Sequence, residues 1–231
     1  KILFDFFKTN ISYKSILNSF FSKNSYSDKD KRKIINISKG ILRNKLIIDK
    51  HIKDYSSILV KKIDVETLIL LYIGIYELIY CDYIPDYASI NTIVDICKKK
   101  HHKSHKFVNA ILRKISLNKI PILSTNSHKT INKNISLHYS YPQWLVNKYL
   151  DFYPDDVVSE ILEESHKIPK LSFRINTLKY SIKDLKNILN INHIDYEQDH
   201  LNKYFFTVDK IDNKNIINEL LSNGYIYIQN P

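Results

Sequence analysis

The spacing of apolar residues changes once along the chain and divides it into two differently built halves. Up to about residue 115, aliphatic residues recur at intervals of three and four positions, which is the period of an amphipathic helix. From Leu171 onward, short alternating runs suited to strands take turns with helical patterns. This order predicts a mainly α fold, in which a helical bundle is followed by a smaller α/β part.

Polar caps and breakers divide the first half into helices. Ser27 and Asp64 stand before long periodic runs and are suited to the N-cap position, and Ser104 stands in the same way before a later run. Pro85 interrupts the periodic pattern, and Asp86 opens the next helix. We expect helices over 2–7 and 13–21 and after each of these caps, all in one bundle spanning residues 1–118.

The second half is expected to be a small α/β subdomain over residues 138–223. The intervening residues 119–137 are rich in Ser, Thr, Asn and Lys and are interpreted as a linker. Pro142 lies in the first turn of an expected helix, and Pro154 begins another. Strands are expected over 171–176, 204–208 and 225–229, with helices after Ser181 and over 213–221.

Charge and composition narrow the class of partner. The net charge is +11 and the isoelectric point is near 9.3, which favours a polyanion, with nucleic acid first and an anionic membrane surface second. The alternative is a genome composition that inflates Lys, Asn and Ile. The longest strongly apolar run, residues 68–76, is too short to span a membrane, and the N-terminus lacks a signal-peptide pattern. We expect a cytoplasmic protein without membrane contact.

The sequence offers no catalytic, cofactor-binding or metal-binding residues. Its three glycines, Gly40, Gly74 and Gly224, are far apart, whereas a loop that cradles phosphate needs clustered glycines. Cys81 and Cys97 belong to no C-x-x-C pair, so we interpret them as buried thiols. No arrangement of Ser, His and Asp indicates a nucleophile.

One segment, residues 98–106, is strongly basic and contains no acidic residue. It lies at an expected helix–helix junction, where its lysines are placed to contact the phosphates of RNA or DNA. The alternative is a solvated loop whose lysines only keep the protein soluble. Its three histidines are a weak basis for a metal site without a nearby carboxylate or cysteine. The predicted phosphate contacts are Lys98, Lys99, Lys100, Lys103, Lys106 and, on the following helix, Arg113.

A second candidate surface is the strand over 171–176. Alternation places Phe173 and Ile175 on one face and Arg174 and Asn176 on the other. A guanidinium group and an amide that face outward from a sheet can hold a phosphate or a base edge. A surface pair that serves solubility explains the same spacing equally well.

Several segments together resemble a known family. Residues 64–80, I-P-D-Y-A-S-I-N at 84–91 and F-V-N-A-I-L-R at 107–113 are similar to the NusB-like helical domain. Y-P-Q-W-L at 141–145, S-F-R-I-N-T at 172–177 and the strand over 224–231 resemble the bacterial 16S rRNA cytosine-5 methyltransferases of the RsmB (Sun/Fmu) type. NusB-like domains also occur alone in antitermination factors.

The resemblance implies an RNA-recognising portion of such an enzyme, with 16S ribosomal RNA as the partner. In that family a Rossmann-like core binds S-adenosylmethionine and carries two catalytic cysteines. Residues 224–231 are then the first strand of that core and the rest of it is missing, so the chain is expected to be part of a longer protein, inactive alone and without bound cofactor. We expect a monomer. The alternative is a stand-alone NusB-like adaptor with no catalytic activity.

Overall fold

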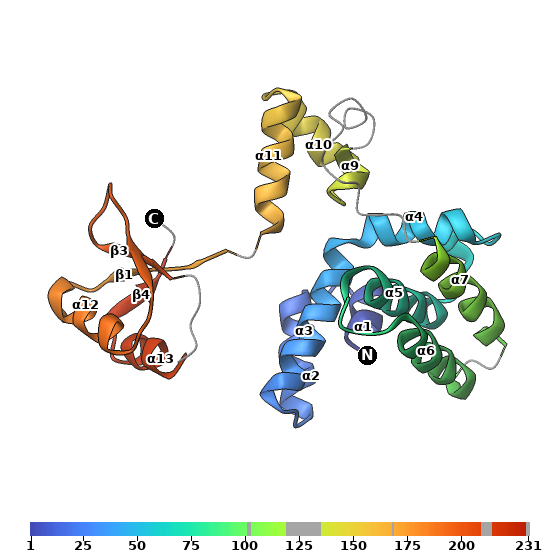
Figure 1. Ribbon diagram of the computed structural model, residues 1–231, viewed down its shortest axis with the longest axis horizontal. Helices are drawn as coiled ribbons and strands as arrows, with labels where there is room; N and C mark the ends of the chain where they lie inside the picture. Colours follow the sequence, from blue (N-terminus) through green and yellow to red (C-terminus); the bar gives the residue numbers. More distant parts are fainter. Residues whose placement is uncertain (101–102, 119–134, 168, 209–213, 230–231) are drawn as a thin grey trace. The chain divides into compact units, whose positions relative to one another are not determined.

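The computed structural model describes residues 1–100, 103–118, 135–167, 169–208 and 214–229. The chain divides into two compact units, Lys1–Glu164 and Ser165–Pro231, each with a core of its own (Figure 1). The first unit is helical and the second combines helices with a four-stranded sheet, which confirms the expected fold class. Most of the expected linker, residues 119–134, lies outside the described residues, while residues 135–138 form a short helix. The division into domains therefore stays a prediction.

Local capping fixes where several helices of the first unit begin. Ser27 and Asp64 each accept a hydrogen bond from a backbone N–H three residues later, which satisfies a donor that the first turn leaves unpaired. Ser104 precedes its helix as expected but makes no side-chain capping bond. The helical elements up to residue 117 are α1 (Ile2–Lys8), α2 (Tyr13–Lys23), α3 (Asp28–Arg43), α4 (Lys45–Tyr55), the 3-10 turn η1 (Val60–Lys62), α5 (Val65–Tyr80), α6 (Asp86–Lys100) and α7 (His105–Leu117).

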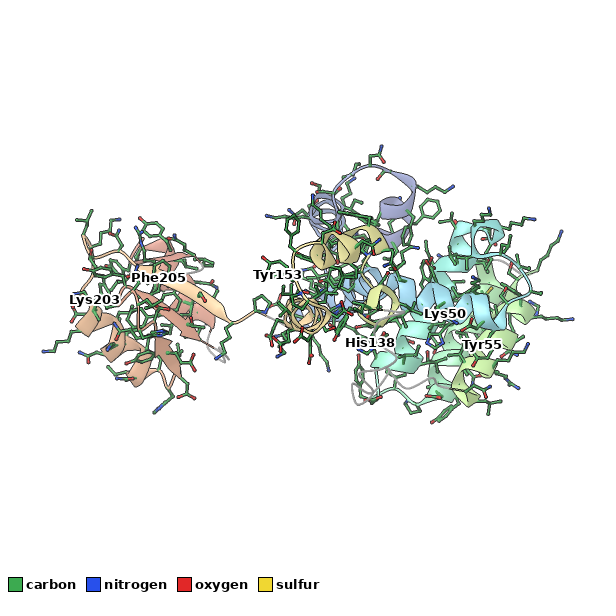
Figure 2. All side chains as sticks on the ribbon, turned by 90° about the horizontal axis from the view of Figure 1, so that it is seen from above. Lys50, Tyr55, His138, Tyr153, Lys203 and Phe205 are labelled. Carbon is green, nitrogen blue, oxygen red and sulfur yellow. The ribbon has the colours of Figure 1, made fainter. Side chains whose placement is uncertain are left out.

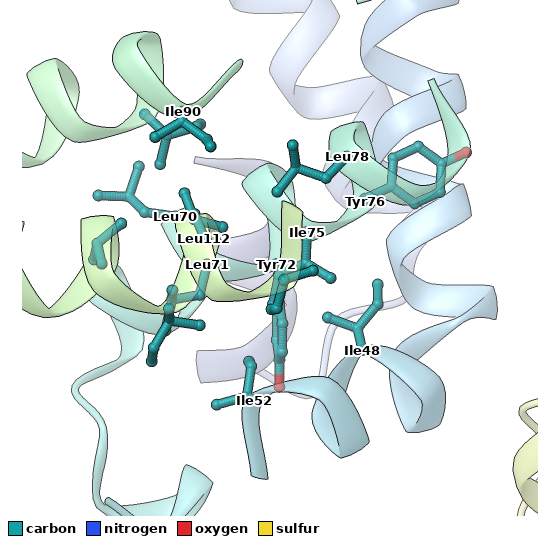
Figure 3. Close-up of a cluster of buried hydrophobic side chains, with 14 of the residues drawn as sticks. Ile48, Ile52, Leu70, Leu71, Tyr72, Ile75, Tyr76, Leu78, Ile90 and Leu112 are labelled. Atoms are coloured by element: carbon teal, nitrogen blue, oxygen red, sulfur yellow. The ribbon is translucent and has the colours of Figure 1, made fainter. Parts of the chain in front are cut away.

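Helix α5 consists mostly of apolar residues and has other helices packed around it. It contacts α1, α3, α4, α6 and α7, and Figure 1 shows it among them. Leu71 and Ile75 are completely buried, and Ile48 of α4 and Leu112 of α7 lie around them (Figure 3). A helix with so little polar surface is stable in water only when neighbours cover most of its circumference. The rest of the helical unit is arranged around this one element.

One polar group that α5 carries into this core is the hydroxyl of Tyr72, and it has a partner. Tyr72 is 1% exposed and donates a hydrogen bond to Asp49 Oδ1 at 2.6 Å. Lys45 binds the other oxygen of Asp49 and lies 5.6 Å from the centre of the Tyr72 ring. Burial, and then the neighbouring carboxylate, raises the pKa of Tyr72 far above its usual value. The hydroxyl therefore remains a donor that joins α5 to α4.

Two glycines permit helices to approach α5 closely. A Cβ on Gly40 of α3 would lie 2.1 Å from the hydroxyl oxygen of Tyr76 and 2.2 Å from its ring. A Cβ on Gly74 of α5 would lie 2.8 Å from a terminal methyl of Leu112 on α7. The first obstacle is a rigid ring, and the second is the end of a flexible side chain. Glycine is therefore required more strictly at position 40 than at position 74.

The last part of the helical unit is a small group of helices with a core of its own. It comprises α9 (Ile135–His138), α10 (Gln143–Leu150) and α11 (Asp155–His166). Ser140, just after α9, has a left-handed backbone with φ of 54°. Its Oγ accepts a hydrogen bond of 3.0 Å from the backbone N–H of Leu46, in the first turn of α4. This bond fastens the small group to the main bundle.

The second unit is a four-stranded antiparallel sheet covered by helices. The strands follow the order β2-β3-β1-β4, so the chain runs strand, helix, strand, strand, helix, strand. Phe173, Phe206 and Ile226 of the sheet pack with Leu185 and Leu220 of the two helices. Figure 1 shows these helices beside the sheet. The elements are β1 (Leu171–Ile175), α12 (Ile182–Ile191), β2 (Tyr196–Gln198), β3 (Phe205–Val208), α13 (Lys214–Ser222) and β4 (Ile226–Ile228).

Two strands of this sheet differ from the sequence-based expectation. Strand β2 is not among the expected strands, because its three residues Tyr-Glu-Gln lie in a polar stretch without an alternating apolar pattern. Residues 224–231 were assigned to the first strand of a cofactor-binding core. In the structure, β4 instead pairs with β1 as the edge strand of the small sheet, with Ile175 opposite Ile226. Alternation identifies a strand but does not identify its neighbour.

Both helices of the second unit end in the same hydrogen-bonding motif. At the end of α13, Tyr225 N–H donates to Leu220 O at 2.9 Å across Gly224, whose φ is +67°. At the end of α12, Ile194 N–H donates to Leu189 O at 2.9 Å, and His193 takes the left-handed conformation with φ of 52°. These are Schellman motifs, in which glycine is favoured at the left-handed position. His193 thus lies at the left-handed position that ends α12.

We expect Gly40→Ala to destabilise the protein by about 1–3 kcal/mol, because the added methyl group overlaps the Tyr76 ring. Gly74→Ala is the matched control in another helix interior. There the Leu112 methyl groups can shift, and alanine gains up to about 1 kcal/mol of helix propensity. Urea unfolding followed by circular dichroism measures both variants. Equal losses at the two positions would contradict this account of the α3–α5 contact.

Stability is expected to fall with pH below about 6.5 because of His51. This side chain on α4 is 4% exposed, and its Nδ1 has no hydrogen-bond partner among the described residues. Burial lowers the pKa of His51, although Asp54 acts in the opposite direction. The unfolded chain therefore takes up a proton first as the pH falls, and the stabilisation present above the unfolded pKa is lost. Unfolding free energies between pH 7 and 5 should fall less steeply for His51→Leu than for the native chain.

Candidate nucleic-acid interface

The basic segment joins the end of α6 to the start of α7. Lys98, Lys99 and Lys100 occupy the last turn of α6, where the negative end of the helix dipole stabilises cations. Lys103 lies in the turn, and Lys106 lies in the first turn of α7, which has no acidic residue. The positive end of α7 therefore faces additional positive charge, an arrangement that an anion relieves. Two of the three histidines of the segment, at positions 101 and 102, lie outside the described residues.

A groove between α6 and α7 gathers three of the predicted cations. Lys98 of α6 lines it together with Lys106 and Arg113 of α7, and its volume is about 430 Å³. Asp95 is the acidic residue of the lining, and it forms an ion pair of 3.3 Å with Lys98. Both side chains of that pair are more than half exposed, so the pair is worth no more than about 1 kcal/mol and exchanges easily for another anion.

The other lysines of the segment do not share this groove. Successive helical residues are about 100° apart, so Lys98 and Lys100 leave α6 on different sides. Lys100 lines a separate apolar groove of about 440 Å³ formed by α1, α5 and α6. Lys99 and Lys103 are exposed. The structure thus separates residues that the sequence grouped by proximity alone.

Three polar residues of the groove were not anticipated. Asn91 lies on α6 one turn before Asp95, while His105 and Asn109 lie on α7 beside Lys106 and Arg113. Their spacing indicates a common face, because residues three and four positions apart are neighbours on the surface of a helix. On α7 the positions 106, 109 and 113 follow that rule. The amide groups add donors and acceptors of hydrogen bonds to a groove that already holds three cations.

The second candidate surface lies on the sheet of the C-terminal unit. Phe173 and Ile175 are buried and Arg174 is exposed, as alternation predicted. The neighbours of Arg174 across the sheet are Phe205 on β3 and Tyr227 on β4. Its guanidinium group forms no hydrogen bond or ion pair with the described residues. Arg174 therefore remains a candidate for contact with a ligand.

Asn176 has a role within the fold. Its Nδ2 donates to the carbonyl oxygen of Gly224 at 2.9 Å and lies 3.4 Å from the hydroxyl of Tyr227. Its Oδ1 accepts from the backbone N–H of Leu178, closing the turn that follows β1. The side chain thus links the ends of β1, α13 and β4. Its predicted contact with RNA stays a prediction beside this structural role.

The two cysteines are buried and unpaired. Cys81 is 2% exposed and Cys97 is completely buried. Burial raises the pKa of both thiols, which disfavours the reactive thiolate. In the described part of the chain, no three His, Cys, Asp or Glu residues are placed to share a metal ion. Likewise, none of the described helices is both long enough and apolar enough to cross a membrane.

Comparison with known protein families shows which family this chain belongs to. Residues 1–117 match the model of the NusB family. The chain belongs to the NusB family. Residues 141–211 of this NusB-family chain match the ferredoxin-like domain of the RsmF/B-like methyltransferase group. The two matches in this order confirm the resemblance to the RsmB type.

Curated relatives align with most of this chain. The probable ribosomal RNA small subunit methyltransferase B of Bacillus subtilis strain 168 is 27% identical over 187 residues, which cover 80% of this chain and 41% of the relative. The ribosomal RNA small subunit methyltransferase B of Shewanella oneidensis is 29% identical over 185 residues, covering 78% and 40%. This NusB-family chain thus spans about 40% of the length of these relatives.

A solved structure shares the fold. The crystal structure of PH0851 superposes with a TM-score of 0.62 and 16% identity. The superposition covers 99% of this chain and 51% of that one.

Substitutions at the two outward residues of the β1 region should separate a structural role from a surface role. Asn176→Ala is expected to cost about 1–2 kcal/mol, because the Gly224 carbonyl and the turn lose their partner. Arg174→Gln should change stability by less than about 0.5 kcal/mol. Amide hydrogen exchange of peptides from Ser165–Pro231, read by mass spectrometry, measures the difference. Similar protection in the two variants would refute the structural role of Asn176.

Proposed function

We propose that this chain is the RNA-recognising portion of an enzyme that methylates small-subunit ribosomal RNA. The α6–α7 groove carries the proposal, since Lys98, Lys106 and Arg113 converge there from two helices. The net charge of +11 favours the same class of partner. The names of the relatives supply the substrate class, which is small-subunit ribosomal RNA. We propose more specifically that the methylated position is C5 of a cytosine in bacterial 16S rRNA.

The chemistry of the groove suits a phosphodiester backbone. The Arg113 guanidinium can bind two phosphate oxygens at once, whereas the two ammonium groups act as point charges. The amides of Asn91 and Asn109 can bind sugar or base edges beside them. Contacts of this kind set the position of the RNA, and each neutralised phosphate releases counterions.

The methyl donor that the proposal implies for the longer enzyme is S-adenosylmethionine. Gly40 and Gly74 are enclosed in helix packing, and Gly224 terminates a helix. The role that we propose for this chain is the binding and positioning of RNA.

A stand-alone NusB-like adaptor is the competing proposal. It accounts for residues 1–117. It does not explain why residues 141–211 match a ferredoxin-like domain of methyltransferases or why the chain contains the four-stranded sheet. The sheet unit supplies the second proposed RNA surface, around Arg174.

The affinity of the 231-residue chain for 16S rRNA should fall linearly with salt on a log–log plot. Replacing Lys98, Lys106 and Arg113 together by Ala should reduce the slope by about 2–3, since up to three phosphate contacts are lost. Filter binding or fluorescence anisotropy at several salt concentrations measures it.

The matched control removes three exposed lysines outside the groove, Lys29, Lys39 and Lys53. It changes the net charge by the same amount, so it should leave the slope within about one of the native value. If both triple variants lose equal affinity, or if salt has no effect on the native chain, the groove is not the RNA site.

A further inference from the structure

One face of the C-terminal sheet carries an arginine between two aromatic residues. Helices α12 and α13 pack against the opposite face, where Phe173, Ile175 and Phe206 point into the core. Because strand residues alternate, Arg174 and the residues opposite it on the neighbouring strands lie on the other face. These are Phe205 on β3 and Tyr227 on β4, so the row across three strands reads Phe205, Arg174, Tyr227 (Figure 2 labels Phe205).

The register sets how closely these side chains approach. The backbone of Ile175 bonds to Tyr204 O at 2.9 Å, which makes the Arg174–Phe205 pair a non-hydrogen-bonded one, with its side chains close together. The neighbouring pair, Ser172 and Thr207, confirms the common face, since their hydroxyl oxygens are 3.1 Å apart. Phe205 is only 6% exposed, so the arginine stem lies beside a covered ring.

Tyr227 is different, because half of its surface is exposed. Its hydroxyl oxygen lies 3.4 Å from Asn176 Nδ2. The Arg174 guanidinium beside it has no partner among the described residues. Glu197 on the edge strand β2 forms an ion pair of 3.3 Å with Lys170. The row therefore presents an exposed aromatic ring next to an available cation.

We propose that this row binds an unpaired nucleotide of RNA, with its base stacked on Tyr227 and its phosphate bound by Arg174. The inference rests on the proposed function and specifies the ligand of the second RNA surface. A base has an apolar face that fits an exposed ring, and the adjoining phosphate is an anion within reach of the next strand. A paired base shows no such face, so the site selects unpaired RNA.

Binding of a labelled RNA of about eight unpaired nucleotides to the full chain tests the proposal. Tyr227→Phe keeps the ring and should bind within about twofold of the native chain, whereas Tyr227→Leu and Tyr227→Ala should lose about tenfold. Arg174→Gln should lower the salt slope by about 0.7, the value for one phosphate of a single strand. A duplex of the same sequence should compete poorly.

The matched control is Tyr153→Ala in the helical unit, because Tyr153 is 48% exposed and Tyr227 is 50% exposed. Figure 2 labels Tyr153. The Tyr153→Ala variant should bind as the native chain does. Circular dichroism checks that every variant folds. For the native chain, photocrosslinking of an RNA containing 4-thiouridine should label the peptide that holds Tyr227, a readout that does not depend on any substitution.

The outcomes separate this inference from the proposed function. Native affinity in Tyr227→Leu, equal competition by the duplex, or crosslinks that avoid Tyr227 would each overturn it. The same holds if the unpaired RNA fails to bind under conditions where 16S rRNA binds through the α6–α7 groove, and the proposed function then survives. Failure of 16S rRNA to bind the native chain is measured with a different probe and overturns the proposed function itself.

Discussion

The helical unit depends on the packing of five helices around α5. A helix with so little polar surface is stable in water only when its neighbours come close enough to exclude water from most of it. The absence of a side chain at Gly40 lets the Tyr76 ring lie directly against α3, and Gly74 receives Leu112 from α7. Helix α7 is thereby held against α5, and α6 packs against both. The α6–α7 groove, with its three cations, exists because two helices are fixed in this way around a third.

Features that depend on local sequence were predictable. Ser27 and Asp64 begin their helices as caps, and the stripe of aliphatic residues in α7 is buried as its period indicated. Strand β1 alternates between the core and the open face as expected. These features follow from interactions within one or two turns or within one strand, which the order of residues specifies directly.

The packing of one helix or strand against another could not be predicted from local sequence. Strand β4 was recognisable, but its pairing with β1 is a long-range choice that its own residues do not encode. The basic segment looked like one surface, yet α6 continues to Lys100 and turns its lysines to different sides. The place of Tyr227 beside Arg174 depends on the register between β1 and β4. The bond from Asn176 to the Gly224 carbonyl likewise joins residues 48 positions apart.

The bond from Leu46 to Ser140 has a consequence for the order in which the chain becomes ordered. The two residues are 94 positions apart, so the acceptor for this N–H emerges from the ribosome long after α4 itself. Until then the first turn of α4, which carries Lys45 close to Asp49, lacks that partner. The helices up to residue 117 are therefore complete in the growing chain before this bond can form, so the bond joins two groups of helices that are synthesised one after the other.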